Sequence, residues 1–170
     1  PHKALPEGGA DAAQRLEMAT LATAELSCPA QVLDVEVRRQ GKSYTADTLR
    51  TLRRQYPEDE LWLLMGTDMF LTLHLWHEPG TILRLAGICA FGRSEQDGED
   101  VFAPQREFLS KTYPDARIAT ITLPGLVDIS STQLRELLAR ERGSEYLLPS
   151  VYGYILMNRL YGTYPCLKRL

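Results

Sequence analysis

Three consecutive hydroxyl residues, Ser130, Ser131 and Thr132, precede Arg135 at the predicted start of a helix. Hydroxyl side chains cap the N–H groups of a first helical turn, and the helix dipole adds partial positive charge at the same end. Arg135 can reach back over this end and form charge-assisted hydrogen bonds. Phosphate is the anion that best fits such a site. The same residues also suit an ordinary capped amphipathic helix, because the leucines that follow form an apolar stripe.

Other candidate residues directly follow predicted strands. Ligands of open α/β sheets bind beyond the carboxyl ends of the strands, so these junctions indicate sites. Gly66 permits close approach of a ligand, and Asp68 suits a ribose hydroxyl or a metal, or simply caps the next turn. Arg93 follows another predicted strand, where it can neutralise phosphates or lie solvated.

A third junction and an aromatic loop add to these candidates. Ser43 or Thr45 can cap a helix and leave backbone N–H groups for a carboxylate or phosphate, or only cap it. Trp76 offers a planar face for stacking, or belongs to the core. His74 and His77 have helical spacing, but without a third ligand nearby they do not predict a metal site.

The elements that must position these residues alternate along the chain. Alternation of helices and strands implies an α/β protein whose parallel sheet is covered on both faces. The charged, glycine-containing segment 92–100 is predicted to be a surface loop. Apolar spacing predicts helices over 11–26, 45–56, 79–85, 104–112 and 131–140, and strands over 32–37, 61–65, 86–91 and 118–123.

Composition excludes several classes of protein. The 170 residues are enough for one core, and 44% hydrophobic with 24% charged residues is ordinary for a globular protein. A net charge of −3 argues against broad nucleic-acid binding but not against a small basic pocket. Cys28, Cys89 and Cys166 show no disulfide or zinc spacing, which favours a reducing cytoplasm. No segment predicts a membrane span or a signal peptide.

Read together, these segments resemble the bacterial nicotinate-nucleotide adenylyltransferases, a branch of the nucleotidyltransferase superfamily. The resemblance runs in order over nearly the whole chain, and the Ser-Tyr-Thr and Trp signals favour this branch over its relatives. It implies a single nucleotidyltransferase domain over 1–170, with a Rossmann-like doubly wound parallel sheet, helices on both faces and a C-terminal helical extension. The matching segments are 1–3, 15–18, 43–49, 66–68, 76, 82–83, 129–135, 146–149, 154–155 and 160–161.

The resemblance also implies a reaction, in which nicotinate mononucleotide attacks the α-phosphate of ATP and releases pyrophosphate. Mg²⁺ is expected on the triphosphate, with phosphate and water as its main ligands and no dedicated protein site. Homo-oligomerisation is left open. The implied catalytic residues are His2, Lys3 and Arg135, with His2 and Lys3 near the nucleotide phosphates. The implied binding residues are Tyr44, Thr45, Trp76 and His77 in the nicotinate pocket, Gly66 and Asp68 at the adenylate ribose or the central nucleotide site, and Ser130, Ser131, Thr132, Arg135 and Arg93 at the ATP phosphates.

The chain departs from the family in one respect. The family's signature G-x-F-D-P-x-H-x-G-H is absent, and the chain starts at Pro1 without an initiator methionine. We therefore expect a preceding segment with the sheet's first strands, without which folding and catalysis would be poor. The sequence also fits two alternative functions. One is a sister transferase with another acceptor, and the other is a non-catalytic nucleotide-binding module, which would bind ATP without releasing pyrophosphate.

Overall fold

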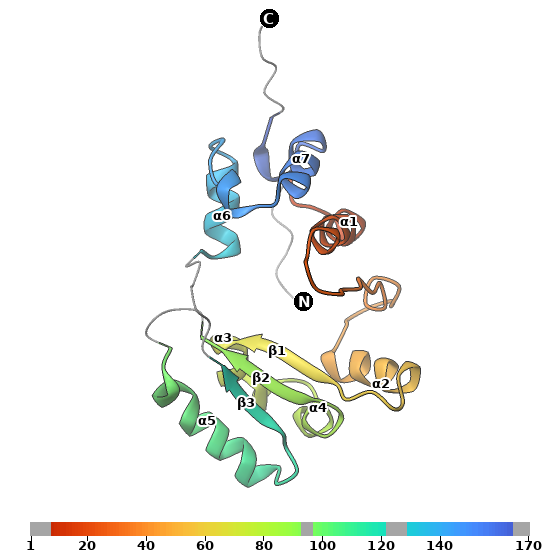
Figure 1. Cartoon of the computed structure of the whole chain (residues 1–170), viewed down its shortest axis with the longest axis vertical. Coiled ribbons are helices and arrows are strands. Elements are labelled where there is room, and N and C mark those ends of the chain that lie inside the picture. Colours follow the sequence, from red (N-terminus) through yellow and green to blue (C-terminus); the bar gives the residue numbers. More distant parts are fainter. Residues whose placement is uncertain (1–7, 93–96, 122–128, 165–170) are drawn as a thin grey trace, which may run out of the picture. The chain divides into compact units, whose positions relative to one another are not determined.

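The computed structural model describes residues 8–92, 97–121 and 129–164. The chain divides into two compact units (Figure 1). The sheet unit is Lys42–Asp128, and the helical unit combines Pro1–Gly41 with Ile129–Leu170. The expectation of one domain over 1–170 stays a prediction.

The sheet unit contains a parallel three-stranded sheet in the order β1-β2-β3. Its strands are β1 (Trp62–Gly66), β2 (Gly87–Phe91) and β3 (Ile118–Ile121). Gly66 pairs with Phe91, and Phe91 pairs with Ile121, so the three carboxyl ends lie at one edge. These strands confirm three of the four predicted from the sequence.

Within the described residues of this unit, four α-helices connect and cover these strands. They are α2 (Thr45–Gln55), α3 (Thr67–Leu71), α4 (Pro79–Leu85) and α5 (Glu99–Thr112). α4 has the predicted bounds, because a proline at the first position suits a helix start. α5 begins five residues before the predicted Pro104, since Glu99 and Asp100 favour a helical N-terminus through the dipole. The five-residue α3 was not predicted because it is too short for a periodic signal.

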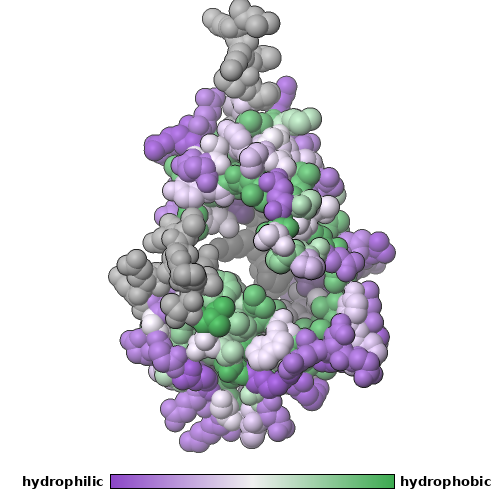
Figure 2. Space-filling model, viewed as in Figure 1, coloured by the Kyte–Doolittle hydropathy of each residue, from purple (hydrophilic) through white to green (hydrophobic). Residues whose placement is uncertain are grey.

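The sheet presents two different faces. Met65, Ile88 and Ala90 are buried in one core with the side chains of α2 to α5. The alternate residues point the other way, and Trp62, Leu64 and Ile121 are exposed. Figure 2 shows apolar surface in the sheet unit, bordered by hydrophilic residues. The α/β class is confirmed, and the exposed face is not covered by the four helices of this unit.

The helical unit contains α1 (Ala12–Ala24), α6 (Ser131–Leu138) and α7 (Pro149–Met157). α1 packs against α7, and the expected C-terminal helical extension is present. The core of this unit consists of Ala10, Leu138, Val151, Ile155 and Leu160. Within the described ranges, no helix is long and apolar enough to cross a membrane.

The predicted strand over 32–37 is wrong. This segment forms turns, in which the Arg38 amide donates to the Asp34 carbonyl at 3.0 Å, and Leu33 and Val37 are exposed. An alternating pattern becomes a strand only when its backbone pairs with a neighbouring strand. The described strands pair only with one another.

Candidate functional site

The start of α2 and the segment before α4 bring together part of the predicted nicotinate pocket. The rings of Tyr44 and His77 have centroids 4.1 Å apart with a tilt of 32°. Trp76 is partly buried against the core, and half of the His77 side chain is exposed. Thr45 is the first residue of α2. We refer to Tyr44, Thr45, Trp76 and His77 as the aromatic cluster.

The cap of α2 differs from the expectation. The N-cap residue is Tyr44, not Ser43 or Thr45, and its side chain makes no capping hydrogen bond. The Tyr44 carbonyl accepts from the amides of Asp47 and Thr48, at 3.0 and 3.2 Å. The N–H groups of Thr45 and Ala46, the first two residues of α2, have no carbonyl of the same helix to bind, and they point out of its N-terminal end. Backbone N–H groups at a helix N-terminus suit a bound carboxylate.

An ion-pair network lies beside the aromatic cluster. Arg50 of α2 forms a salt bridge with Glu78, the residue before α4, and a second one of 2.9 Å with Asp47. Glu78 also accepts from the Thr81 hydroxyl at 3.0 Å, and its carboxylate lies 3.3 Å from His77 Nε2. Its backbone is left-handed, with φ of 53°. These contacts fix the approach of the chain to α4.

The same network gives stability a pH dependence. The hydrogen bond from Arg50, followed by that from Thr81, holds the pKa of Glu78 below its ordinary value of 4.5. A carboxylate with a lowered pKa stabilises the fold above its unfolded pKa, and the effect is lost as the pH falls through the folded pKa. We expect the urea midpoint of the wild type to fall more steeply below pH 4.5 than that of Glu78→Gln. If the urea midpoints of the wild type and of Glu78→Gln fall with pH at the same rate, this expectation is contradicted.

The carboxyl ends of β1 and β2 carry a second group. Gly66 ends β1, and the exposed Asp68 lies in the first turn of α3, while their role at the ribose stays a prediction. Thr67 between them is buried, and its hydroxyl donates to Asp97 Oδ2 at 2.6 Å. Thr67 and Asp97 were missed because nothing in the sequence connects positions so far apart.

The hydroxyl segment lies in the helical unit. Ser130 is the N-cap of α6, where its hydroxyl accepts from the Gln133 amide at 3.2 Å and its amide donates to the Gln133 side chain at 2.7 Å. Ser131 and Thr132 form the exposed first turn. The Arg135 guanidinium carbon lies 5.6 Å from the ring centroid of Tyr161. The predicted cap is confirmed, and the phosphate role stays a prediction.

Replacement of Ser130 by alanine should reduce the free energy of unfolding by about 1 kcal/mol, because the cap is lost. Ser131→Ala is the matched control, since Ser131 is not the cap, and its change should stay within about 0.5 kcal/mol. Urea denaturation of both variants measures the difference. Equal losses of unfolding free energy in the two variants would show that the capping hydrogen bonds of Ser130 do not stabilise the fold.

The histidine pair lies within the described residues, whereas several other candidates do not. His74 Nδ1 lies 3.0 Å from the Gln105 amide nitrogen, which gives this histidine a partner within the fold. No group of three metal-binding side chains occurs among the described residues. His2, Lys3 and Arg93 lie outside the described residues, and so does Cys166.

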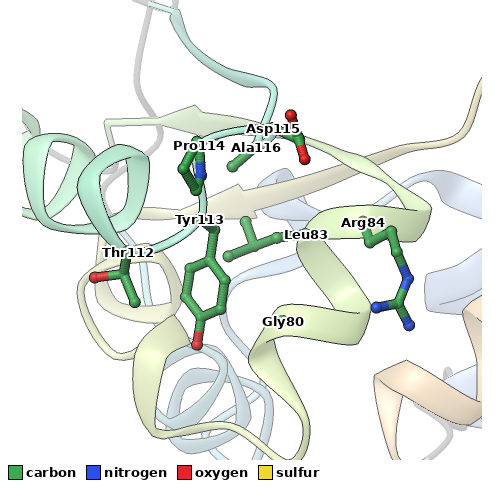
Figure 3. Close-up of a pocket in the computed structure, with 8 residues that line it drawn as sticks. All are labelled: Gly80, Leu83, Arg84, Thr112, Tyr113, Pro114, Asp115 and Ala116. Carbon is green, nitrogen blue, oxygen red and sulfur yellow. The ribbon is translucent and has the colours of Figure 1, made fainter.

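A pocket of about 220 Å³ lies between α4 and the segment from α5 to β3 (Figure 3). Tyr113 and Leu83 form its apolar wall, and Gly80 leaves room for the tyrosine ring, because an added Cβ would lie 3.0 Å from it. None of the predicted site residues lines this pocket.

Comparison with solved structures shows the fold of the chain. The fold is similar to that of Plasmodium falciparum nicotinic acid mononucleotide adenylyltransferase complexed with APC, with a TM-score of 0.69 and 20% identity over 89% of this chain and 76% of that chain. The same enzyme complexed with NaAD gives a TM-score of 0.66 at 18% identity, over 89% of this chain and 75% of that chain. This chain therefore has the Rossmann-like nucleotidyltransferase fold.

Curated relatives define the family, although no family model matches the chain. A probable nicotinate-nucleotide adenylyltransferase of Neisseria meningitidis serogroup C is 34% identical over 168 residues, which are 92% of this chain and 81% of the relative. One from Shewanella sp. strain MR-7 is 37% identical over 173 residues, 95% of this chain and 80% of the relative. The chain belongs to the nicotinate-nucleotide adenylyltransferase family, and the resemblance predicted from its sequence is confirmed.

Proposed function

We infer that this chain transfers the adenylyl group of ATP to nicotinate mononucleotide, giving nicotinate adenine dinucleotide and pyrophosphate. Membership of the family supports the reaction. The observation that carries the choice of acceptor is the aromatic cluster at the N-terminus of α2, where the N-cap side chain makes no capping hydrogen bond. It combines flat rings with backbone donors, as a pyridine carboxylate requires.

The acceptor is held by stacking and by backbone hydrogen bonds. We propose that Trp76 stacks on the pyridine ring, with Tyr44 and His77 beside it. The ring carboxylate accepts from the backbone N–H groups near Thr45 and His77. These donors favour the acid over the amide, because a carboxylate only accepts hydrogen bonds whereas an amide also donates them.

The donor nucleotide is assigned to two groups of residues. Gly66 allows close approach of the adenylate, and Asp68 accepts from its ribose. The first turn of α6, with Ser130, Ser131, Thr132 and Arg135, binds ATP phosphates. We assign His2, Lys3 and Arg93 to the same phosphates on the family resemblance alone.

The chemistry requires positioning and charge neutralisation. A phosphate oxygen of the acceptor bonds to the α-phosphorus of ATP, and the bond from that phosphorus to the bridging oxygen breaks. Pyrophosphate leaves with this electron pair and carries additional negative charge. Arg135, Lys3 and helix N–H groups stabilise this charge, so no covalent enzyme intermediate is needed.

A divalent cation, which we propose to be Mg²⁺, accompanies ATP. The described residues contain no cluster of three ligating side chains, whereas Asp68 offers one exposed carboxylate at the end of β1. This donor set fits an ion held mainly by phosphates and water, with Asp68 as one carboxylate beside the proposed ribose site. When bound, Mg²⁺ neutralises charge on the triphosphate.

We also propose that the protein works in the cytoplasm on these small molecules. Cys28 and Cys89 are free thiols, which suits a reducing compartment.

The test is pyrophosphate release from ATP by the full-length protein, with nicotinate mononucleotide and the nicotinamide form as alternative acceptors. We expect strong preference for the acid and no release without an acceptor. Preference for the amide or another acceptor would favour a sister transferase. ATP binding without turnover of any acceptor would support a non-catalytic module.

A further inference from the structure

A buried hydroxyl joins three segments at the carboxyl ends of β1 and β2. Thr67 is 5% exposed, and its Oγ1 lies 2.6 Å from Asp97 Oδ2 and 3.5 Å from the Phe91 carbonyl oxygen. A threonine hydroxyl has one proton to donate. The shorter contact ends on a carboxylate, which makes it the stronger, charge-assisted bond.

The location of this bond is specific. Thr67 follows Gly66 and begins α3, so it shares the first helical turn with Asp68. Asp97 precedes Gly98, the N-cap of α5, which makes no side-chain capping bond. The bond from Thr67 therefore connects the end of β1 to the chain entering α5, and α3 and α5 also pack together. Gly66 and Asp68, which are assigned to the adenylate ribose, lie on either side of Thr67, the donor of this bond.

We propose that Thr67 is a positioning residue of the donor nucleotide site, which acts by holding Asp97 against the carboxyl ends of β1 and β2. This inference rests on the proposed function, because it assigns Gly66 and Asp68 to ATP. Without the hydroxyl, the Asp97 carboxylate loses the donor that joins it to the start of α3, so the segment that leads into α5 is held less firmly. The entry to α5 then shifts, and the surface that receives the ribose changes shape.

A purely structural hydroxyl would behave differently. Its loss would reduce stability and the amount of active enzyme, and would leave KM for both substrates unchanged. A positioning residue of the donor site changes KM for ATP selectively, because the aromatic cluster is carried by other elements, the start of α2 and the segment before α4.

The test compares Thr67→Val with Thr67→Ser in the full-length protein. Valine keeps the shape and removes the donor, and we expect KM and Kd for ATP to rise about tenfold, because the surface that receives the ribose is held less firmly; this corresponds to about 1.4 kcal/mol of binding free energy. Serine restores the donor and should restore the affinity for ATP. KM for nicotinate mononucleotide should stay at the wild-type value in both variants.

Thr51→Val is the matched control, since the Thr51 hydroxyl is also partly buried but donates to the Asp47 carbonyl within α2. Its ATP affinity should equal that of the wild type. Unchanged ATP affinity in Thr67→Val, or an equal loss in Thr67→Ser, would overturn the inference. Calorimetric titration with ATP keeps this test separate from the proposed function: if the wild type binds ATP but turns over no acceptor, the reaction is refuted while the measured affinities still decide the role of Thr67.

Discussion

Arg135→Ala should lower kcat/KM for adenylyl transfer by about 10²-fold, the loss that follows removal of one group that stabilises transition-state charge. Arg135 is exposed on α6, one turn after the hydroxyl residues, and helical side chains incline toward the N-terminal end. The charge on the leaving pyrophosphate grows as the bond breaks. The loss should therefore fall mainly on kcat, as measured by steady-state pyrophosphate release.

Two variants separate the role of Arg135 from general charge effects. Arg135→Lys keeps the positive charge but loses the planar fork that binds two phosphate oxygens, so its activity should be intermediate. Arg140→Ala removes an equal charge just beyond the other end of α6 and should retain wild-type kinetics. If Arg140→Ala loses as much activity as Arg135→Ala, net charge and not position determines the effect.

Local chemistry explains which parts of the fold were predictable. α4 has its predicted bounds because Pro79 marks the start and the apolar pattern ends at Leu85. The cap at Ser130 was predictable because its partner, Gln133, lies three residues away. The buried strands β1 and β2 were recognised as continuous apolar runs, which suit a parallel sheet.

The features that escaped prediction depend on distant partners. The segment 32–37 has a strand pattern but no neighbouring strand among the described residues, and Tyr44 replaces the expected hydroxyl cap of α2. Arg50 meets Glu78 across 28 positions, and Thr67 meets Asp97 across 30. Such contacts arise only when the folded chain brings the segments together, so no local pattern identifies them. Candidate site residues that lie within one element could therefore be selected from the sequence, whereas residues that contact each other across the fold could not.

Trp76→Ala should raise KM for nicotinate mononucleotide by about tenfold or more, because stacking of one base on an aromatic ring contributes about 1–3 kcal/mol. Trp76 lies next to His77, whose ring contacts Tyr44, so its loss removes the largest flat surface of the aromatic cluster. Looser holding of the ring also moves the carboxylate from its backbone donors. The preference for the acid over the amide should weaken, as measured by kcat/KM for the two acceptors.

Trp76 also packs against the core, so the free energy of unfolding must be measured beside the kinetics. Trp76→Phe keeps an aromatic face and should recover much of the acceptor affinity. Trp62→Ala is the matched control, because this tryptophan is 42% exposed on the other face of the sheet, with the Arg117 guanidinium carbon 5.4 Å from its ring centroid. It should leave KM for nicotinate mononucleotide unchanged. A Trp76→Ala enzyme that is destabilised but keeps its acceptor KM would assign Trp76 to the core and refute the stacking role.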